Sequence, residues 1–212
     1  MTAEWLERRQ ESFGASEMMA LLVALGMEKA PDGMPKYMQE DARLIFRRKA
    51  RKLAPERKSQ AATAGQDAEL PLIMAWNERP TRGFPAPVIP AGVIPSRFLP
   101  ILHRKQPRLS MTPDGWAHFH KEFLIVEVKT DVHGGKTDVT PWWWWQCQTQ
   151  MAVADTQVGL VLYGERWIAW HDNKGPIHPW IVERDEAAVA RCLEAAELGW
   201  REVEKIKEAA NG

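Results

Sequence analysis

The feature that most constrains the fold is a continuous apolar run at residues 123–126, followed directly by Glu127, Val128 and Lys129. A run of this kind is typical of a strand that is buried on both faces, in the middle of a sheet. Residues two apart on a strand point to the same face, so Glu127 and Lys129 would project into one pocket. Charges in such a place need partners or a metal ion to offset the cost of burial.

A second carboxylate is expected to join this pair. Asp114 stands in a Pro-Asp-Gly turn, thirteen residues before Glu127, and a hairpin over residues 109–130 would return it to the end of the strand. Two carboxylates and a lysine suit a hard divalent cation and an activated water, which is chemistry for cutting phosphodiesters. For the Glu-X-Lys triplet alone, an ordinary charged pair at a strand end is the alternative.

The rest of the chain predicts helices, then strands, then a helix. Apolar periodicity and capping residues give helices at 5–11, 17–26, 37–53, 65–76, 142–154 and 185–209, and β-like runs at 158–163, 167–171 and 177–182. Ser16 and Asp185 would cap the helices that follow them, and the proline-rich residues 80–108 would be extended. This order predicts an α/β fold with a central mixed sheet flanked by helices.

Composition limits the kind of protein. A chain of 212 residues, 45% hydrophobic, predicts one domain over residues 1–212. Its net charge of zero argues against a protein that coats nucleic acid but permits a local basic groove. The Arg- and Lys-rich residues 43–58 fit either a solvated helix face or a basic wall facing DNA. Without a membrane-length apolar stretch, a signal peptide or metal-type cysteine spacing, a cytoplasmic protein with no membrane contact is expected.

Glutamate and glutamine residues could complete the predicted site. Glu69 follows Gly65 at an expected helix start, although a lone helical glutamate is most often a surface residue. Gln146 and Gln150 share one helix face, where an amide can hydrogen-bond a metal-bound water or a phosphate without adding charge. A packed aromatic helix with exposed amides is the alternative.

Two further groups could contact DNA directly. Trp143, within the run of four tryptophans, could stack on a nucleobase. Arg9 and the hydroxyl of Ser16 could together bind a phosphate at a helix start, although Ser16 is equally explained as a helix cap.

In this order, the motifs resemble the lambda-exonuclease (YqaJ-type viral recombinase) branch of the PD-(D/E)XK nucleases. The resemblance spans about residues 5–205 and rests on six motifs together, each of which is weak alone. They are Trp5/Arg9, Gly14-Ala15-Ser16, Gly65/Glu69, Thr112-Pro113-Asp114-Gly115, Glu127-Val128-Lys129 and Trp143/Gln146/Gln148/Met151. The chain departs from the family at Trp143, where tyrosine is common.

The resemblance implies a restriction-endonuclease-like core and a role for each matched residue. Asp114 and Glu127, with the Val128 carbonyl and assistance from Glu69, would hold Mg²⁺, and Mn²⁺ would also support activity. Lys129 would orient or deprotonate the attacking water, and Gln146 would brace the site. The DNA contacts would come from Arg9 and Ser16 at the terminal 5′-phosphate and from Trp143 and Gln148.

The implied activity is 5′–3′ exonuclease digestion of double-stranded DNA. The product would carry 3′ single-strand overhangs for phage-type recombination, with a single-strand annealing protein as partner and a homotrimer as the assembly. A structure-specific or restriction-like endonuclease of the same fold is the alternative, and a non-catalytic DNA-binding module is a third hypothesis. The end-gripping pair Arg9 and Ser16 favours the exonuclease, and the intact Asp114, Glu127 and Lys129 favour an enzyme.

Overall fold

The computed structural model describes residues 3–51, 60–79, 83–84, 87–90, 100–119, 121–131, 135–165 and 175–211. The helices are α1 Ala3–Gln10, the 3₁₀ turn η1 Ala15–Glu17, α2 Met18–Ala24, α3 Lys36–Ala50, α4 Gln60–Glu78, α5 Pro141–Ala154 and α6 Glu186–Asn211. The strands are β1 Phe13–Gly14, β2 Val88–Pro90, β3 Ile101–Leu102, β4 Leu109–Met111, β5 Gly115–Phe119, β6 Glu122–Asp131, β7 Val158–Glu165 and β8 Ile177–Glu183. Within these ranges, every helix is too short or too polar to cross a membrane.

A five-stranded mixed sheet forms the centre of the fold. Its strand order is β2-β5-β6-β7-β8, in which β6 and β7 run parallel and the other neighbours run antiparallel. Strand β6 therefore occupies the middle of the sheet, as its apolar run predicts. The predicted α/β architecture with a central mixed sheet flanked by helices is confirmed.

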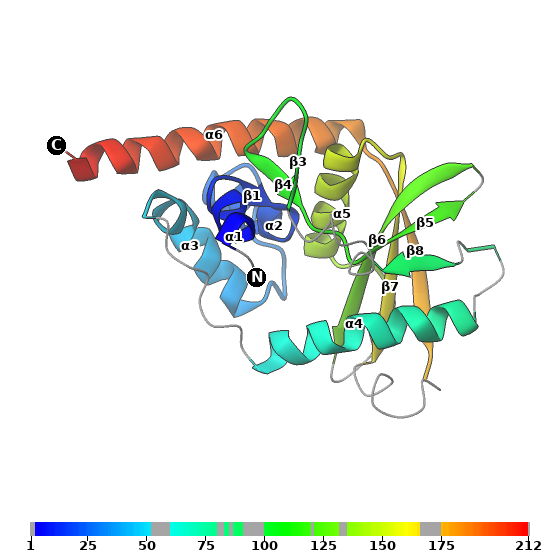
Figure 1. Cartoon of the computed structure of the whole chain (residues 1–212). Coiled ribbons are helices and arrows are strands. Elements are labelled where there is room, and N and C mark those ends of the chain that lie inside the picture. The colour runs from blue at the N-terminus through cyan, green and yellow to red at the C-terminus, as the bar shows by residue number, and fades with distance from the viewer. Residues whose placement is uncertain are drawn as a thin grey trace.

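Helices cover both faces of this sheet (Figure 1). Helix α4 packs on one face and α5 on the other, and α5 in turn separates the sheet from a second layer of α2, α3 and α6. Helix α5 is buried on both sides, and its buried residues include the polar Gln146, Gln148, Thr149 and Gln150. The sheet and the outer helical layer thus share α5 as their common wall.

The alternation of β6 side chains between these two faces positions the predicted site. Leu124 and Val126 belong to the cluster that packs against α4, whereas Ile125 packs with residues of α5. By the same period of two, Glu127 and Lys129 point toward α5. The expectation that these two residues share one face is confirmed.

A second, three-stranded sheet joins the N-terminal segment to the segment that precedes Asp114. Its order is β1-β4-β3, with β1 parallel and β3 antiparallel to β4. In the parallel pair Phe13 lies opposite Leu109, and Gly14 opposite Ser110. The predicted hairpin over residues 109–130 is therefore wrong in its first part, because β4 pairs with β1 and β3 and only β5 and β6 form the hairpin.

One predicted cap and one predicted helix start are wrong, and the other predicted cap is confirmed. Ser16 lies inside η1 rather than at a cap, and the carboxylate of Glu17 instead accepts a hydrogen bond from the N–H of Gly14 at 2.7 Å. Gly65 lies within α4, since the alanine-rich residues before it are also helical. The last helix is capped by Asp185, whose Oδ1 accepts from the N–H groups of Ala187 and Ala188.

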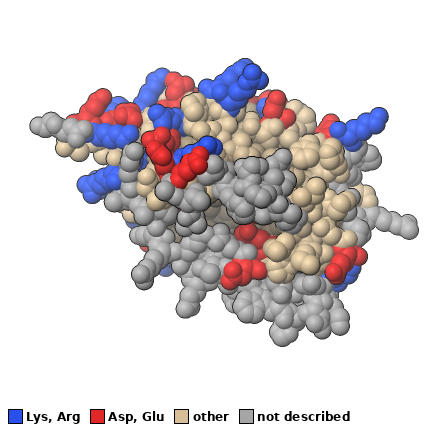
Figure 2. Space-filling view, in the orientation of Figure 1, with Lys and Arg blue, Asp and Glu red and all other residues tan. Residues whose placement is uncertain are grey.

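The other predicted helices and strands are found within a few residues of their expected bounds, but the run at 167–171 lies outside the described residues. The long helix α6 presents charges of both signs to solvent. Figure 2 shows them side by side along the upper edge of the molecule, where α6 lies. Ion pairs one turn apart, such as Arg201 with Glu197 and Lys205 with Glu202, account for this interleaving.

Candidate active site

Asp114 extends the pairing of β5 with β6 by one residue beyond the start of β5. Its N–H donates to the carbonyl of Val126 at 3.1 Å, and its Oδ2 accepts from the N–H of Val128 at 2.7 Å. The turn before β5 is tight against β2, because a Cβ at Gly115 would lie 2.9 Å from Val88 Cγ1 and 3.0 Å from the carbonyl of Ile89. Glycine at this position therefore lets the turn hold the carboxylate beside β6.

Glu127, Lys129 and Gln146 form a closed hydrogen-bonded triangle between β6 and α5. Lys129 Nζ donates to Glu127 Oε1 at 2.5 Å and to Gln146 Oε1 at 2.9 Å. Gln146 Nε2 donates to the same Glu127 oxygen at 2.5 Å. The Glu127 side chain is only 5% exposed and the Lys129 side chain 19%, so this polar group is held in a largely water-free setting where its interactions are strong.

Gln150 belongs to this group, although the sequence only placed it on the same helix face as Gln146. Its Nε2 donates to Glu127 Oε2 at 2.5 Å, so both oxygens of Glu127 are engaged by amides of α5. Gln150 is fully buried. The spacing of four residues between the two glutamines was the sequence signal that could have identified it.

Replacing Gln150 by Leu is expected to lower cleavage activity about 10–100-fold, because a carboxylate that loses a supporting hydrogen bond is less well oriented. The measurement is the rate of digestion of linear duplex DNA with saturating Mg²⁺. The exposed Gln157 provides the matched control, Gln157→Leu. Equal activity of Gln150→Leu and the wild type would show that Glu127 needs no support from Gln150.

Glu69 approaches the site from the opposite face of the sheet. It lies on α4 in register with Leu72, Ile73 and Trp76, which are buried against the sheet, so it projects from the same stripe of the helix. Its negative charge acts on Asp114. The structure thus brings together Glu69, Asp114, Glu127, Lys129 and Gln146.

Three carboxylates and one lysine meet in this group, so negative charge exceeds positive charge. Burial raises the pKa of Asp114 well above its ordinary value, and the charges of Glu127 and Glu69 raise it further. Burial alone would lower the pKa of Lys129, but Glu127 and Asp114 outweigh burial and hold that pKa above its ordinary value. Lys129 is therefore an ammonium ion at neutral pH.

The chemistry of these residues fits a divalent cation such as Mg²⁺. Carboxylate and carbonyl oxygens are its preferred ligands, and Val128 presents its carbonyl on the same strand edge as the N–H that meets Asp114. Among the described residues, however, the acidic side chains do not yet form a ready-made cluster of three ligands. The two oxygens of Glu127 already accept hydrogen bonds from Lys129, Gln146 and Gln150. Binding a metal ion therefore requires Glu127 to exchange at least one of these donors for the ion.

Arg9 and Ser16, predicted to grip a phosphate, are in direct contact. Arg9 Nη2 donates to Ser16 Oγ at 3.0 Å and lies 3.6 Å from Glu17 Oε2. Ser16 is exposed. The neighbouring Ala15 packs in one cluster with Cys147 of α5, which adjoins Gln146 in sequence. Both the Arg9–Ser16 pair and the carboxylate group, by which we mean Asp114, Glu127 and Glu69, therefore lie near the first half of α5.

Trp143 lies half-buried on the same face of the sheet. Its ring centroid is 5.8 Å from that of Tyr163 and 6.3 Å from that of Trp180. Tyr163 lies opposite Lys129 in the register of β6 and β7, so Trp143 covers the sheet next to the lysine. Stacking of Trp143 on a nucleobase stays a prediction.

Gln148 does not belong to a DNA-contacting surface, which corrects the assignment made from its motif. Its side chain is fully buried, its Nε2 donates to the carbonyl of Glu183 at 2.8 Å, and its Oε1 accepts from the N–H of Asp185 at 2.9 Å. A side chain with both amide ends engaged inside the protein joins α5 to the start of α6. The resemblance placed Gln148 on a DNA-contacting surface, but α5 is buried on both sides and leaves no such surface at this residue.

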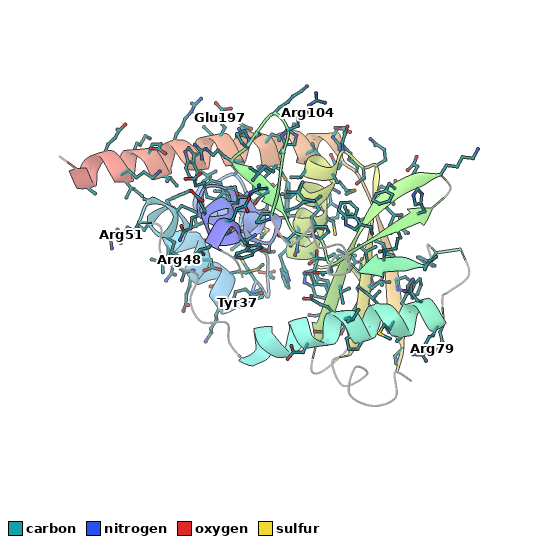
Figure 3. All side chains as sticks on the ribbon, in the orientation of Figure 1. Tyr37, Arg48, Arg51, Arg79, Arg104 and Glu197 are labelled. Atoms are coloured by element: carbon teal, nitrogen blue, oxygen red, sulfur yellow. The ribbon has the colours of Figure 1, made fainter. Side chains whose placement is uncertain are left out.

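The basic helix α3 is neither a uniformly solvated face nor a uniform wall. Arg43, Arg47 and Arg51 are exposed, whereas Arg48 pairs with Asp41 and Lys49 is buried. Figure 3 shows Arg48 and Arg51 toward the outer end of α3 and Tyr37 at the end that faces α4. Tyr37, which the sequence did not single out, is 61% exposed and lies within electrostatic reach of Lys129.

Comparison with known proteins places this fold. The chain matches no family model and no curated protein sequence. Among solved structures, it is similar to the alkaline exonuclease LHK-Exo from Laribacter hongkongensis (16% identity, 99% of this chain, 96% of that chain, TM-score 0.70) and to LHK-Exo in complex with dAMP (18%, 99%, 96%, 0.69). It is also similar to a phage-related exonuclease from Haemophilus somnus (11%, 94%, 96%, 0.65).

These likenesses cover nearly the whole chain and show its fold. The protein has the restriction-endonuclease-like fold that its motifs predict, and it shares this fold with the three solved structures above. The three solved structures named above are exonucleases by their descriptions.

Proposed function

We propose that this protein is a metal-dependent exonuclease that digests double-stranded DNA from its 5′ ends. The observation that carries the proposal is the convergence of Asp114, Glu127 and Lys129 at the middle of the sheet, beside a separate Arg9–Ser16 pair. The first group suits phosphodiester hydrolysis, and the second suits a terminal phosphate. The similar LHK-Exo structure with dAMP, a deoxynucleoside monophosphate, supports a product of this class.

The side chains divide the work of hydrolysis. Asp114 and Glu127, with the Val128 carbonyl and Glu69 near them, would hold Mg²⁺ or Mn²⁺, which supplies Lewis-acid activation of water and neutralises charge on the phosphate. Lys129, held as an ammonium ion, donates hydrogen bonds to the scissile phosphate and stabilises the negative charge that develops there. Glu127 and Asp114 raise the pKa of Lys129, so Lys129 is an ammonium ion before a metal ion binds. Gln146 and Gln150 fix the orientation of Glu127.

The remaining parts of the proposal follow the same resemblance. The exonuclease would leave 3′ overhangs for phage-type recombination, pass them to a single-strand annealing protein, and act as a homotrimer. Leu70 and Met74, one turn apart on the outer face of α4 and about half exposed, support an oligomer, since exposed apolar pairs favour protein contacts.

The test is digestion of a linear duplex labelled at either the 5′ or the 3′ end, with Mg²⁺ and with chelator. The proposal expects Mg²⁺-dependent release of labelled mononucleotide from the 5′ end and no attack on closed circular duplex. Equal rates on circular and linear duplex would instead identify a structure-specific or restriction-like endonuclease. Absence of cleavage with retained duplex binding would identify a non-catalytic module.

Replacing Arg9 by Ala is expected to remove most of the preference for a 5′-phosphorylated end, about tenfold or more in kcat/KM, since a charge-assisted hydrogen bond is lost. The measurement compares 5′-phosphoryl and 5′-hydroxyl duplexes. Arg8 offers a matched control, because its guanidinium pairs with Glu4 at the surface. A variant Arg9→Ala that keeps the full preference would place the phosphate site elsewhere.

A further inference from the structure

Lys49 is a buried lysine on α3, a helix whose residues Arg43 and Arg47 are exposed. It is 6% exposed, and its ammonium group donates to three acceptors from the N-terminal segment. These are the carbonyl of Arg9 at 2.7 Å, the carbonyl of Ser12 at 2.7 Å and Glu17 Oε2 at 3.1 Å. A lysine is buried in this way only when its three donors are satisfied.

Burial disfavours the positive charge of Lys49, and the carboxylate of Glu17 favours it. Burial lowers the pKa of Lys49, and the positive charge of Arg9 lowers it too, while the carboxylate of Glu17 opposes both. Glu17 is itself kept ionised, since Lys49 and Arg9 lower its pKa against the effect of burial. Lys49 and Glu17 therefore each favour the charged form of the other, beneath the segment 9–17, which we call the N-terminal turn.

This pair fixes Arg9 at both ends. Lys49 binds the backbone carbonyl of Arg9, and Glu17 lies 3.6 Å from its guanidinium. The guanidinium rests on Gly14, where any Cβ would overlap it. The N–H of Gly14 is held by Glu17, so the surface under Arg9 is set by the same carboxylate.

The N-terminal turn is also tied to the strand that leads to Asp114. Ser12 Oγ, next to the carbonyl bound by Lys49, lies 2.8 Å from Ser110 Oγ in β4. Four residues later along the chain comes Asp114. A displacement of the turn would therefore change the placement of Arg9 relative to the carboxylate group.

We propose that Lys49, with Glu17, is the positioning residue of a 5′-phosphate site. Its buried ammonium group holds the turn so that Arg9 and Ser16 meet a terminal phosphomonoester at a set distance from Asp114. This inference rests on the proposed end-binding role of Arg9. Lys49 itself does not touch the substrate. It determines how well a phosphorylated end is distinguished from a hydroxyl end.

The test measures binding without cleavage, using duplexes with a 5′-phosphoryl or a 5′-hydroxyl end in Ca²⁺. In Lys49→Met, affinity for the phosphoryl duplex is expected to fall about tenfold more than affinity for the hydroxyl duplex, because a misplaced Arg9 loses a hydrogen bond to a charged group. The control is Lys36→Met, which replaces an exposed lysine of the same helix. The double variant Glu17→Gln/Lys49→Met removes both buried charges and serves if the single variant does not fold.

An unchanged ratio of the two affinities in a folded variant would overturn the inference, as would an equal fall in both, which indicates a purely structural lysine. A wild type that does not distinguish the two ends overturns the end-binding proposal and this inference with it. Discrimination by the wild type that is lost in the variant supports the role of Lys49, even if Mg²⁺ elicits no cleavage and the nuclease proposal fails.

Discussion

The Lys129→Met variant is expected to lose cleavage activity by about 10³-fold while still binding duplex DNA. The loss is large because a charged donor aimed at developing negative charge in a water-poor site contributes several kcal/mol to the transition state. Lys129 is held by Glu127 and Gln146, so it is already oriented before substrate arrives. The measurement is single-turnover digestion of linear duplex in Mg²⁺, with duplex binding measured separately in Ca²⁺.

Gln146 and Gln150 still donate to both oxygens of Glu127 in the variant, but this buried carboxylate loses its cationic partner, so the variant is expected to be less stable than the wild type. A methionine also replaces the aliphatic part of the lysine in a largely buried position. Lys105→Met, at an exposed turn residue, is the matched control and should digest DNA at the wild-type rate. Wild-type activity of Lys129→Met would exclude this site as the place of hydrolysis.

The convergence of Asp114, Glu127, Lys129 and Gln146 could be predicted from sequence because local rules position these residues. A period of two places Glu127 and Lys129 on one face of β6. A Pro-Asp-Gly turn and an adjacent hairpin return Asp114 to them. A spacing of four residues along α5 places Gln146 and Gln150 together on the same carboxylate. None of these steps requires knowledge of long-range packing beyond one hairpin and one helix.

The parts that sequence did not predict depend on distant partners. Strand β4 leaves the expected hairpin because it pairs with β1, more than 90 residues earlier. Lys49 is indistinguishable from its exposed neighbours until three acceptors from the N-terminal segment surround it. Gln148 follows the motif of its helix, but the start of α6 determines its partners.

These distant contacts decide how the two halves of the proposed site are joined. The β1–β4 pairing and the contact of Ala15 with α5 both connect the Arg9–Ser16 turn to the carboxylate group. An exonuclease needs such a rigid connection, since the scissile phosphate lies a set distance from the end of the strand. An endonuclease has no comparable need.

Replacing Asp114 by Asn is expected to abolish Mg²⁺-dependent cleavage and, without metal, to stabilise the fold. Activity falls because a carboxylate ligand is lost. Stability rises because desolvation and the charges of Glu127 and Glu69 raise the pKa of Asp114, so its ionisation in the folded state is unfavourable. Asparagine can still accept the hydrogen bond from the N–H of Val128. A gain of about 1 kcal/mol would raise Tm by about 2–4 °C in a chain of this length.

The stability difference between Asp114→Asn and the wild type should depend on pH. A carboxyl whose folded-state pKa is raised contributes stability that is fully present below its unfolded pKa, about 3.9, and is lost as pH rises through the folded value. The difference in Tm between Asp114→Asn and wild type should therefore grow as pH rises from about 4 toward neutrality. Added Mg²⁺ should raise the Tm of the wild type, since a ligand that binds only the folded state stabilises it, and should leave that of the variant nearly unchanged. A variant less stable than wild type at neutral pH without metal would mean that Lys129 and the N–H of Val128 already compensate the charge of Asp114, and that no cation is needed to complete the site.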